Sequence, residues 1–189
     1  MTAQLFGLCV RFTAPAAVRD RYAPEMSISS PQELAARLAQ ADYLCDEGLA
    51  VGMYLALTMH RPLLLEGEPG VGKTEAAKSL ATALGAELIR LQCYEGIDAS
   101  QALYEWDYSR QLLHARAIQD GATEQDQRVK ELFSEQFLVE RPLLQAVRKG
   151  AGAVLLIDEI DRADDEFEAF LLEFLAEFTI TIPEVGTIR

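Results

Sequence analysis

The chain has 189 residues, 50% of them hydrophobic and 25% charged, which is the composition of a globular protein with a sizeable core. Its formal net charge of −13 disfavours a nucleic-acid-binding face. No apolar run approaches the ~20 residues that cross a bilayer, and no basic residue precedes the apolar segment 5–10, so the sequence predicts a cytoplasmic protein without a secretory signal.

Cysteine and histidine are sparse and scattered. Cys9, Cys45 and Cys93 are an odd number of widely spaced thiols, which predicts neither a disulfide framework nor a zinc site. His60 and His114 stand apart from the cysteines and from each other. No metal site built from protein ligands alone is predicted.

The first predicted element is a helix that begins after Ser30. Ser30-Pro31-Gln32-Glu33 reads as a capping box with proline at the first helical position. Residues 1–25 show no clear periodicity, and we expect residues 1–29 to be an N-terminal extension of a core that spans 30–189. Removal of residues 1–25 is then predicted to leave the melting temperature almost unchanged. Between Leu34 and Met59 the pattern predicts two helices, with a break near 46–48.

Strands and helices alternate along the rest of the chain. The fold class predicted is therefore α/β, with a parallel sheet covered by helices on both faces. Buried strands are predicted at 63–65, 87–92 and 153–157, and helices at 73–84, 142–149 and 164–178. The segment 98–119 is predicted to be mostly helical, 119–127 a loop, and 179–189 a hairpin.

The turn after the first predicted strand is rich in glycine. Gly67–Thr74 fits the pattern Gly-x-x-x-x-Gly-Lys-Thr, whose backbone N–H groups curl around phosphate oxygens at a helix N-terminus. Lys73 is predicted to bridge the β- and γ-phosphates of ATP, and Thr74 to offer its hydroxyl to Mg²⁺. The predicted cofactor-binding residues are Gly67, Glu68, Pro69, Gly70, Val71, Gly72, Lys73, Thr74 and Glu75.

A second motif ends the strand at 153–157. Asp158 and Glu159 follow this apolar run at the carboxyl edge of the predicted sheet, where α/β folds bind ligands. Asp158 is predicted to hold Mg²⁺ together with Thr74, and Glu159 to orient and deprotonate the attacking water, so Lys73 and Glu159 are the predicted catalytic residues. The other acids up to Glu177 read as a solvated helix face.

Aromatic residues gather between 91 and 116, namely Tyr94, Tyr104, Trp106 and Tyr108. Acidic residues are mixed among them, which argues against a platform for stacking bases. Packing against the sheet or against a neighbouring subunit is the favoured interpretation, and a surface that grips a client protein is the alternative.

The two motifs together, Gly67–Thr74 and Leu155–Ala163, resemble those of the AAA+ ATPases, specifically the MoxR branch. The segments 92–96, 104–106 and 181–184 are similar to a MoxR subgroup associated with carbon monoxide dehydrogenase maturation. The resemblance covers roughly 30–189.

This resemblance implies an ATP-hydrolysing ring, usually a homo-hexamer, that remodels a client protein. It also implies a partner with a von Willebrand factor A domain and a metalloenzyme client. In the family, a strand from later in the sequence lies between the two motif strands, and a sensor residue, a trans-acting arginine and a helical lid follow. On this basis the chain is expected to be the N-terminal portion of an ATPase, with the neighbours of the 63–65 strand beyond Arg189.

Two other functional classes stay open. One is a nucleotide-binding interaction module that does not hydrolyse ATP. The other is a DNA-linked motor, which the acidic charge balance disfavours.

Overall fold

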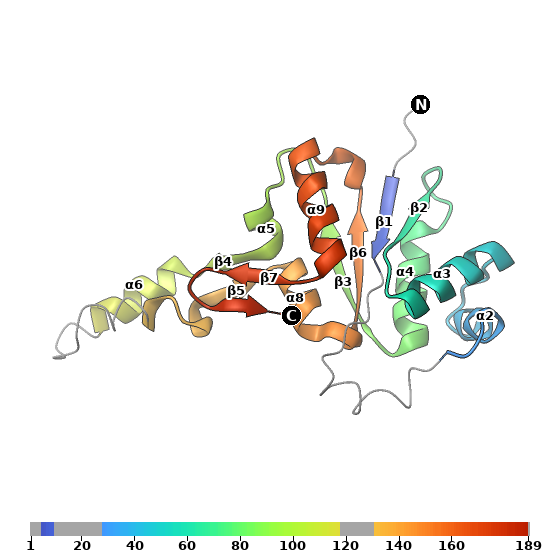
Figure 1. The fold of residues 1–189 in the computed structure, drawn as a ribbon, viewed down its shortest axis with the longest axis horizontal. Helices are drawn as coiled ribbons and strands as arrows, with labels where there is room; N and C mark the ends of the chain where they lie inside the picture. The colour runs from blue at the N-terminus through green and yellow to red at the C-terminus, as the bar shows by residue number, and fades with distance from the viewer. Residues whose placement is uncertain (1–4, 10–27, 118–130, 189) are drawn as a thin grey trace.

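The computed structural model describes residues 5–9, 28–117 and 131–188 (Figure 1). Its centre is a four-stranded sheet in the order β2-β1-β6-β3. The strands are β1 (Leu5–Cys9), β2 (Leu63–Glu66), β3 (Glu87–Gln92) and β6 (Ala153–Asp158). β3 and β6 are parallel, whereas β1 runs antiparallel to both β2 and β6. β2, β3 and β6 therefore point the same way, and the predicted parallel arrangement of these strands is confirmed.

Three helices cover one face of the sheet, α2 (Pro31–Gln40), α3 (Glu47–Met59) and α4 (Lys73–Leu84) (Figure 1). They share a core cluster with Val154 and Leu156 of β6. The predicted cap of α2 is present, since the Ser30 Oγ accepts the N–H of Glu33 at 3.2 Å. The Glu33 carboxylate accepts the N–H and Oγ–H of Ser29 instead of closing the box on Ser30, and these bonds, with Arg37, lower its pKa to about 2.

The opposite face carries α8 (Pro142–Lys149), α9 (Asp165–Glu177) and the hairpin of β7 (Ile180–Ile182) and β8 (Gly186–Ile188) (Figure 1). Their apolar residues form a second cluster with Leu155 and Ile157 of β6. The predicted helices at 142–149 and 164–178 and the hairpin are confirmed. Among the described residues, no helix is long and apolar enough to cross a membrane.

β6 separates these two clusters by simple alternation. Successive side chains of a strand point to opposite faces, so Val154, Leu156 and Asp158 face α4, while Leu155 and Ile157 face α8 and α9. All six residues of β6 are buried. The alternation therefore delivers the carboxylate of Asp158 to the face that carries the glycine-rich turn.

The segment 98–119, predicted to be mostly helical, contains two helices, but a strand that was not predicted separates them. The chain forms α5 (Ala99–Leu103), then β4 (Tyr104–Trp106), then α6 (Tyr108–Ala117). β4 pairs antiparallel with β5 (Leu138–Glu140), which lies more than thirty residues later in the sequence. Aromatic residues favour a strand where a partner is available, and the partner is supplied only by the fold. The predicted loop at 119–127 lies outside the described residues.

β1 departs most from the sequence-based expectation. Residues 1–29 were expected to lie outside the core, yet Leu5–Cys9 pairs with β2 on one side and β6 on the other. The expectation that both neighbours of the 63–65 strand lie beyond Arg189 is therefore wrong for the side occupied by β1. A short apolar segment can hydrogen-bond to the free N–H and C=O groups of a strand edge in either the parallel or the antiparallel direction. Its own residues do not specify which strand it pairs with. The domain boundary at residue 29 stays a prediction.

β2 is also less buried than predicted. Its side chains alternate between half-buried and exposed positions, and 53% of Leu64 is accessible to solvent. The prediction of a strand buried on both faces is wrong for the part of the chain that the structure describes, where β2 is the edge strand of the sheet and helices pack against one of its faces.

The pairing of β1 reverses the sequence-based expectation that removing residues 1–25 leaves the melting temperature almost unchanged. Deletion of residues 1–9 is expected to lower the melting temperature by on the order of 5–10 °C. Removing β1 breaks the hydrogen-bonded ladder on both sides, each bond contributes about 1 kcal/mol net, and 1 kcal/mol shifts a domain of this size by about 2–4 °C. The measurement is a thermal melt followed by circular dichroism. Deletion of residues 1–4 alone is the matched control, and equal melting of both variants would contradict the pairing of β1.

Candidate functional site

The glycine-rich turn links β2 to α4 and exposes backbone N–H groups. Gly70 and Gly72 adopt left-handed conformations with φ values of 85° and 92°, which other residues rarely tolerate. α4 begins at Lys73 after Gly72, and no side chain caps this helix end. The first-turn N–H groups of a helix lack intrahelical acceptors and carry its positive dipole end. The turn is therefore built to receive an anion.

Lys73 is folded back onto this turn. Only 9% of the residue is exposed, and its Nζ donates to the carbonyl oxygens of Gly67 at 2.6 Å and Glu68 at 2.7 Å. A cavity of about 230 Å³ opens beside it. Gly70, Gly72, Lys73, Thr74 and Glu75 line this cavity. The exposed side chains of Glu66, Glu68 and Glu75 leave the backbone as the surface that an anion would meet.

A second cavity, of about 440 Å³, adjoins the turn and shares Lys73 with the first. Its walls come from the α2–α3 connection, from α3, from β2 and from the turn itself. They comprise Tyr43, Asp46, Gly48, Leu49, Gly52, Leu63, Leu65, Glu66, Val71 and Lys73. Tyr43, Asp46 and Leu49 were not predicted as site residues, because their proximity to Lys73 comes from the packing of α2 and α3 against β2.

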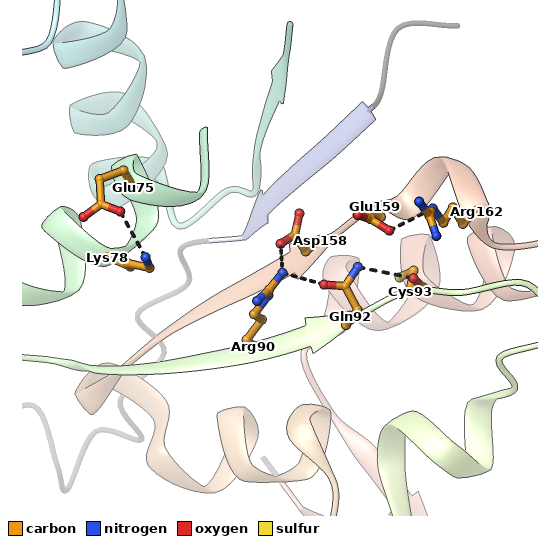
Figure 2. Close-up of polar contacts among 8 residues, drawn as sticks. All are labelled: Glu75, Lys78, Arg90, Gln92, Cys93, Asp158, Glu159 and Arg162. Atoms are coloured by element: carbon orange, nitrogen blue, oxygen red, sulfur yellow. Dashed lines mark hydrogen bonds and ion pairs between the residues drawn. The ribbon is translucent and has the colours of Figure 1, made fainter. Parts of the chain in front are cut away.

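Asp158 ends β6 with a buried carboxylate. Its side chain is 2% exposed, and its Oδ2 accepts a hydrogen bond of 2.5 Å from the Arg90 guanidinium (Figure 2). Its other oxygen, Oδ1, is buried without a hydrogen-bond partner among the described residues. A buried unpaired carboxylate oxygen is costly unless a ligand completes it, and it suits a hard cation such as Mg²⁺.

No group of three histidines, cysteines or acids gathers around a point in the described part of the chain. Mg²⁺ commonly binds proteins through one or two oxygen ligands and takes the rest from water and phosphate. Asp158 therefore fits such a cation as a single anchoring carboxylate, and Thr74 offers a hydroxyl on the same face of the sheet.

Glu159 turns away from Asp158. Its backbone is left-handed, with φ 55° and ψ 45°, an unusual conformation for a residue with a side chain and one that is often found at functional sites. Its carboxylate forms an ion pair with Arg162, 2.8 Å from the Arg162 Nε, and its side chain is 25% exposed (Figure 2). In this conformation each carboxylate of the second motif is paired with an arginine.

The structure brings the predicted residues together in part. Lys73 and Thr74 line one cavity, while Asp158 and Glu159 lie at the end of β6 and line neither of the two cavities described above. Pro69 lies in the turn but is absent from both cavity walls, and Val71 lines only the larger one. Arg90, Gln92 and Arg162 complete the polar contacts around the carboxylates and were not predicted.

Cys93 lies beside these acids as an inert thiol. It is fully buried, and burial together with Asp158, Asp161 and Glu159 raises its pKa from 9.0 to about 12. Its backbone N–H donates to the Asp158 carbonyl at 2.8 Å, which continues the β3–β6 ladder up to the site. The residue is therefore structural and not nucleophilic.

Alkylation by iodoacetamide at pH 8 is expected to modify Cys93 only after denaturation. Cys45, which is half-buried, is the internal comparison and is expected to react first. Peptide mass spectrometry over time reports both thiols. Because an unfolded thiol ionises near 9 and the folded one near 12, the contribution of Cys93 to stability is lost as the pH rises across that interval. Rapid labelling of Cys93 in the folded chain would contradict its burial.

The aromatic segment divides between core and surface. Trp106 is 8% exposed and packs edge-on against Tyr104 and Phe133, as the packing interpretation predicts. Tyr94 and Tyr108 are 46% and 66% exposed and line a cavity of about 940 Å³ near β4. No residue of the glycine-rich turn lines this cavity. Trp106 fits the packing interpretation of the segment, and the exposed Tyr94 and Tyr108 fit the alternative of a surface that grips a client protein.

Comparison with known proteins places the chain in context. Residues 62–189 match the family model described as AAA domain (dynein-related subfamily). The uncharacterized protein YehL of Escherichia coli is 28% identical over 134 residues, which are 70% of this chain and 32% of YehL. Midasin of Giardia intestinalis is 44% identical over 48 residues, 25% of this chain and 1% of midasin. The chain thus spans a third or less of these relatives, and no solved structure matches it.

Proposed function

The chain belongs to the dynein-related subfamily of AAA domains, and on that premise we propose that it binds ATP with Mg²⁺ and hydrolyses it. The observation that carries the proposal is the uncapped N-terminus of α4 next to the buried Lys73, on a turn with two left-handed glycines. A helix end of this kind is a ready phosphate site.

We assign the phosphates to the cavity beside Lys73. The ammonium now satisfies two carbonyl oxygens of its own turn, so it is held near the position that β- and γ-phosphate oxygens would occupy. Phosphate oxygens are stronger acceptors for an ammonium group than neutral carbonyls, which favours the exchange. The adjoining cavity, with Tyr43 and Leu49 on its walls, is proposed to hold the adenosine part.

The carboxylates take the remaining roles. Mg²⁺, when bound, neutralises charge that develops on the phosphates, and Thr74 and Asp158 are proposed to hold it. Glu159 is proposed to orient the attacking water and accept its proton. In the present conformation Glu159 is paired with Arg162, so the proposed mechanism requires this carboxylate to turn toward the substrate.

A second candidate function is a nucleotide-binding module that does not hydrolyse ATP. The pairing of both carboxylates with Arg90 and Arg162 favours it, because a general base held in an ion pair is not free to accept a proton. The two candidates share nucleotide binding and differ in turnover.

The finer assignments rest on the resemblance alone. We propose a MoxR-type ATPase that acts in the cytoplasm, assembles as a homo-hexamer in the complete protein, and remodels a client. A partner with a von Willebrand factor A domain and a role in maturing carbon monoxide dehydrogenase or another metalloenzyme belong to the same proposal. The segments 92–96, 104–106 and 181–184 support the subgroup, and neither YehL nor midasin extends that support.

The test is calorimetric titration of the chain with ATP and Mg²⁺, followed by a phosphate-release assay. Binding with steady phosphate release supports the ATPase, and binding without release supports the non-hydrolysing module. No binding at millimolar ATP would contradict both candidates.

A further inference from the structure

The contact between Arg90 and Asp158 has a consequence for metal binding. Arg90 and Gln92 lie on β3, two residues apart, and both face α4 because β3 alternates in the same way as β6. Gln92 is the register partner of Asp158, and Arg90 lies two residues earlier, opposite Leu156. The guanidinium therefore extends along the sheet to reach the carboxylate (Figure 2).

Arg90 is held in this position from two sides. Its Nη2 donates to Asp158 Oδ2 and to Gln92 Oε1, each at 2.5 Å, and the Gln92 amide in turn donates to the Cys93 carbonyl at 3.4 Å. The two partners differ sharply in exposure: the Arg90 side chain is 52% exposed and that of Asp158 only 2%. Arg90 can return to water, whereas Asp158 cannot.

Arg90 compensates a charge that would otherwise be buried alone. An isolated carboxylate in a protein interior is strongly unfavourable, and one oxygen of Asp158 has no partner among the described residues. A divalent cation that binds Asp158 supplies the same compensation. It would then lie within a few ångströms of the guanidinium, where two positive charges repel.

We propose that Arg90 is the resident counter-ion of Asp158, a positioning residue that holds the carboxylate in place and withdraws to solvent when Mg²⁺ binds. This inference rests on the proposed nucleotide function for its metal-binding step. The ion pair itself does not depend on that function. The two parts are tested separately.

The first experiment is a set of thermal melts in EDTA without nucleotide. Arg90→Ala leaves the buried carboxylate unpaired and is expected to lower the melting temperature by on the order of 5 °C. Asp158→Asn leaves only a half-exposed arginine unpaired and is expected to shift the melting temperature by less than about 2 °C. The double variant, Arg90→Ala with Asp158→Asn, is expected to behave in the same way. Equal losses for the two single variants, or additive losses in the double variant, would overturn the counter-ion role.

The second experiment measures how strongly Mg²⁺ improves nucleotide affinity. The dissociation constant of a fluorescent ADP analogue is measured in EDTA and in Mg²⁺. The value in EDTA divided by the value in Mg²⁺ reports how much the metal strengthens binding. Any general effect of the lost charge on phosphate binding cancels in this ratio. Removing a repelling charge is expected to raise it at least about tenfold in Arg90→Ala, while Arg90→Lys, which keeps the charge, is expected to stay near the wild type.

Lys149→Ala is the matched control. It removes one positive charge from an ion pair with Glu87, at the other end of β3, and is expected to leave the ratio unchanged. A ratio in Arg90→Ala that equals or falls below that of the wild type would overturn the competition between Arg90 and Mg²⁺. Failure of the wild-type chain to bind the analogue would instead contradict the proposed function. The melts in EDTA would still show whether Arg90 compensates the buried charge of Asp158.

Discussion

Replacing Glu159 by glutamine is expected to preserve ATP binding and to slow hydrolysis by about two to four orders of magnitude. Glutamine keeps the shape of the side chain but cannot accept a proton at neutral pH. The residue lies at the end of β6 and lines neither cavity beside the glycine-rich turn, so its loss leaves the proposed phosphate contacts intact. Single-turnover phosphate release and equilibrium binding of ATP separate the two effects.

Asp161→Asn is the control for this substitution. It makes the same change of charge two residues later, on an exposed side chain, and is expected to keep both binding and turnover. Parallel loss of binding and turnover in Glu159→Gln would mean that Glu159 holds the nucleotide, and the role of general base would be wrong. Unchanged turnover would show that another group accepts the proton.

Substitution of Lys73 by alanine is expected to weaken ATP binding and turnover together, by about a hundred- to a thousand-fold. Among the described residues, Lys73 is the one positive side chain that lines the cavity beside the turn. Its ammonium is already desolvated, so no water shell need be removed as phosphate binds. In a site with few water molecules such a charge interacts more strongly with phosphate than it would in solution.

Lys78→Ala is the matched control for this substitution, because Lys78 lies on the same helix and pairs with Glu75 on its exposed surface. This variant is expected to bind ATP within about twofold of the wild type, since exposed ion pairs contribute little. A thermal melt of Lys73→Ala distinguishes lost binding from lost folding. A folded Lys73→Ala chain with full affinity for ATP would contradict the assignment of the phosphate site.

Several elements could be predicted from the sequence because their determinants are local. α4 spans Lys73–Leu84 and ends at Gly85 in a left-handed cap, as the glycine spacing predicts. α2 begins after Ser30 with the side-chain cap that the sequence indicates. β6 follows from an unbroken apolar run that ends in two acids. In each case a few consecutive residues specify the backbone.

Other features required the tertiary structure because they join distant segments. The β4–β5 ladder pairs 104–106 with 138–140, and β1 enters the sheet between strands that begin at 63 and 153. Short apolar segments pair with whatever edge the fold presents, so their partners cannot be read from their own residues.

The candidate site shows the same division. The residue types in Gly67–Thr74 and at Asp158 and Glu159 predict a phosphate turn and a metal-binding carboxylate, and both assignments stay predictions. The contact of Arg90 with Asp158 joins residues 68 positions apart. The cavity that Tyr43 lines depends on how α2 and α3 pack against β2. Local pattern determined which groups can do the chemistry. Packing of the sheet and its helices decided which charges surround them, because electrostatic contacts depend on distance in space and not on distance along the chain.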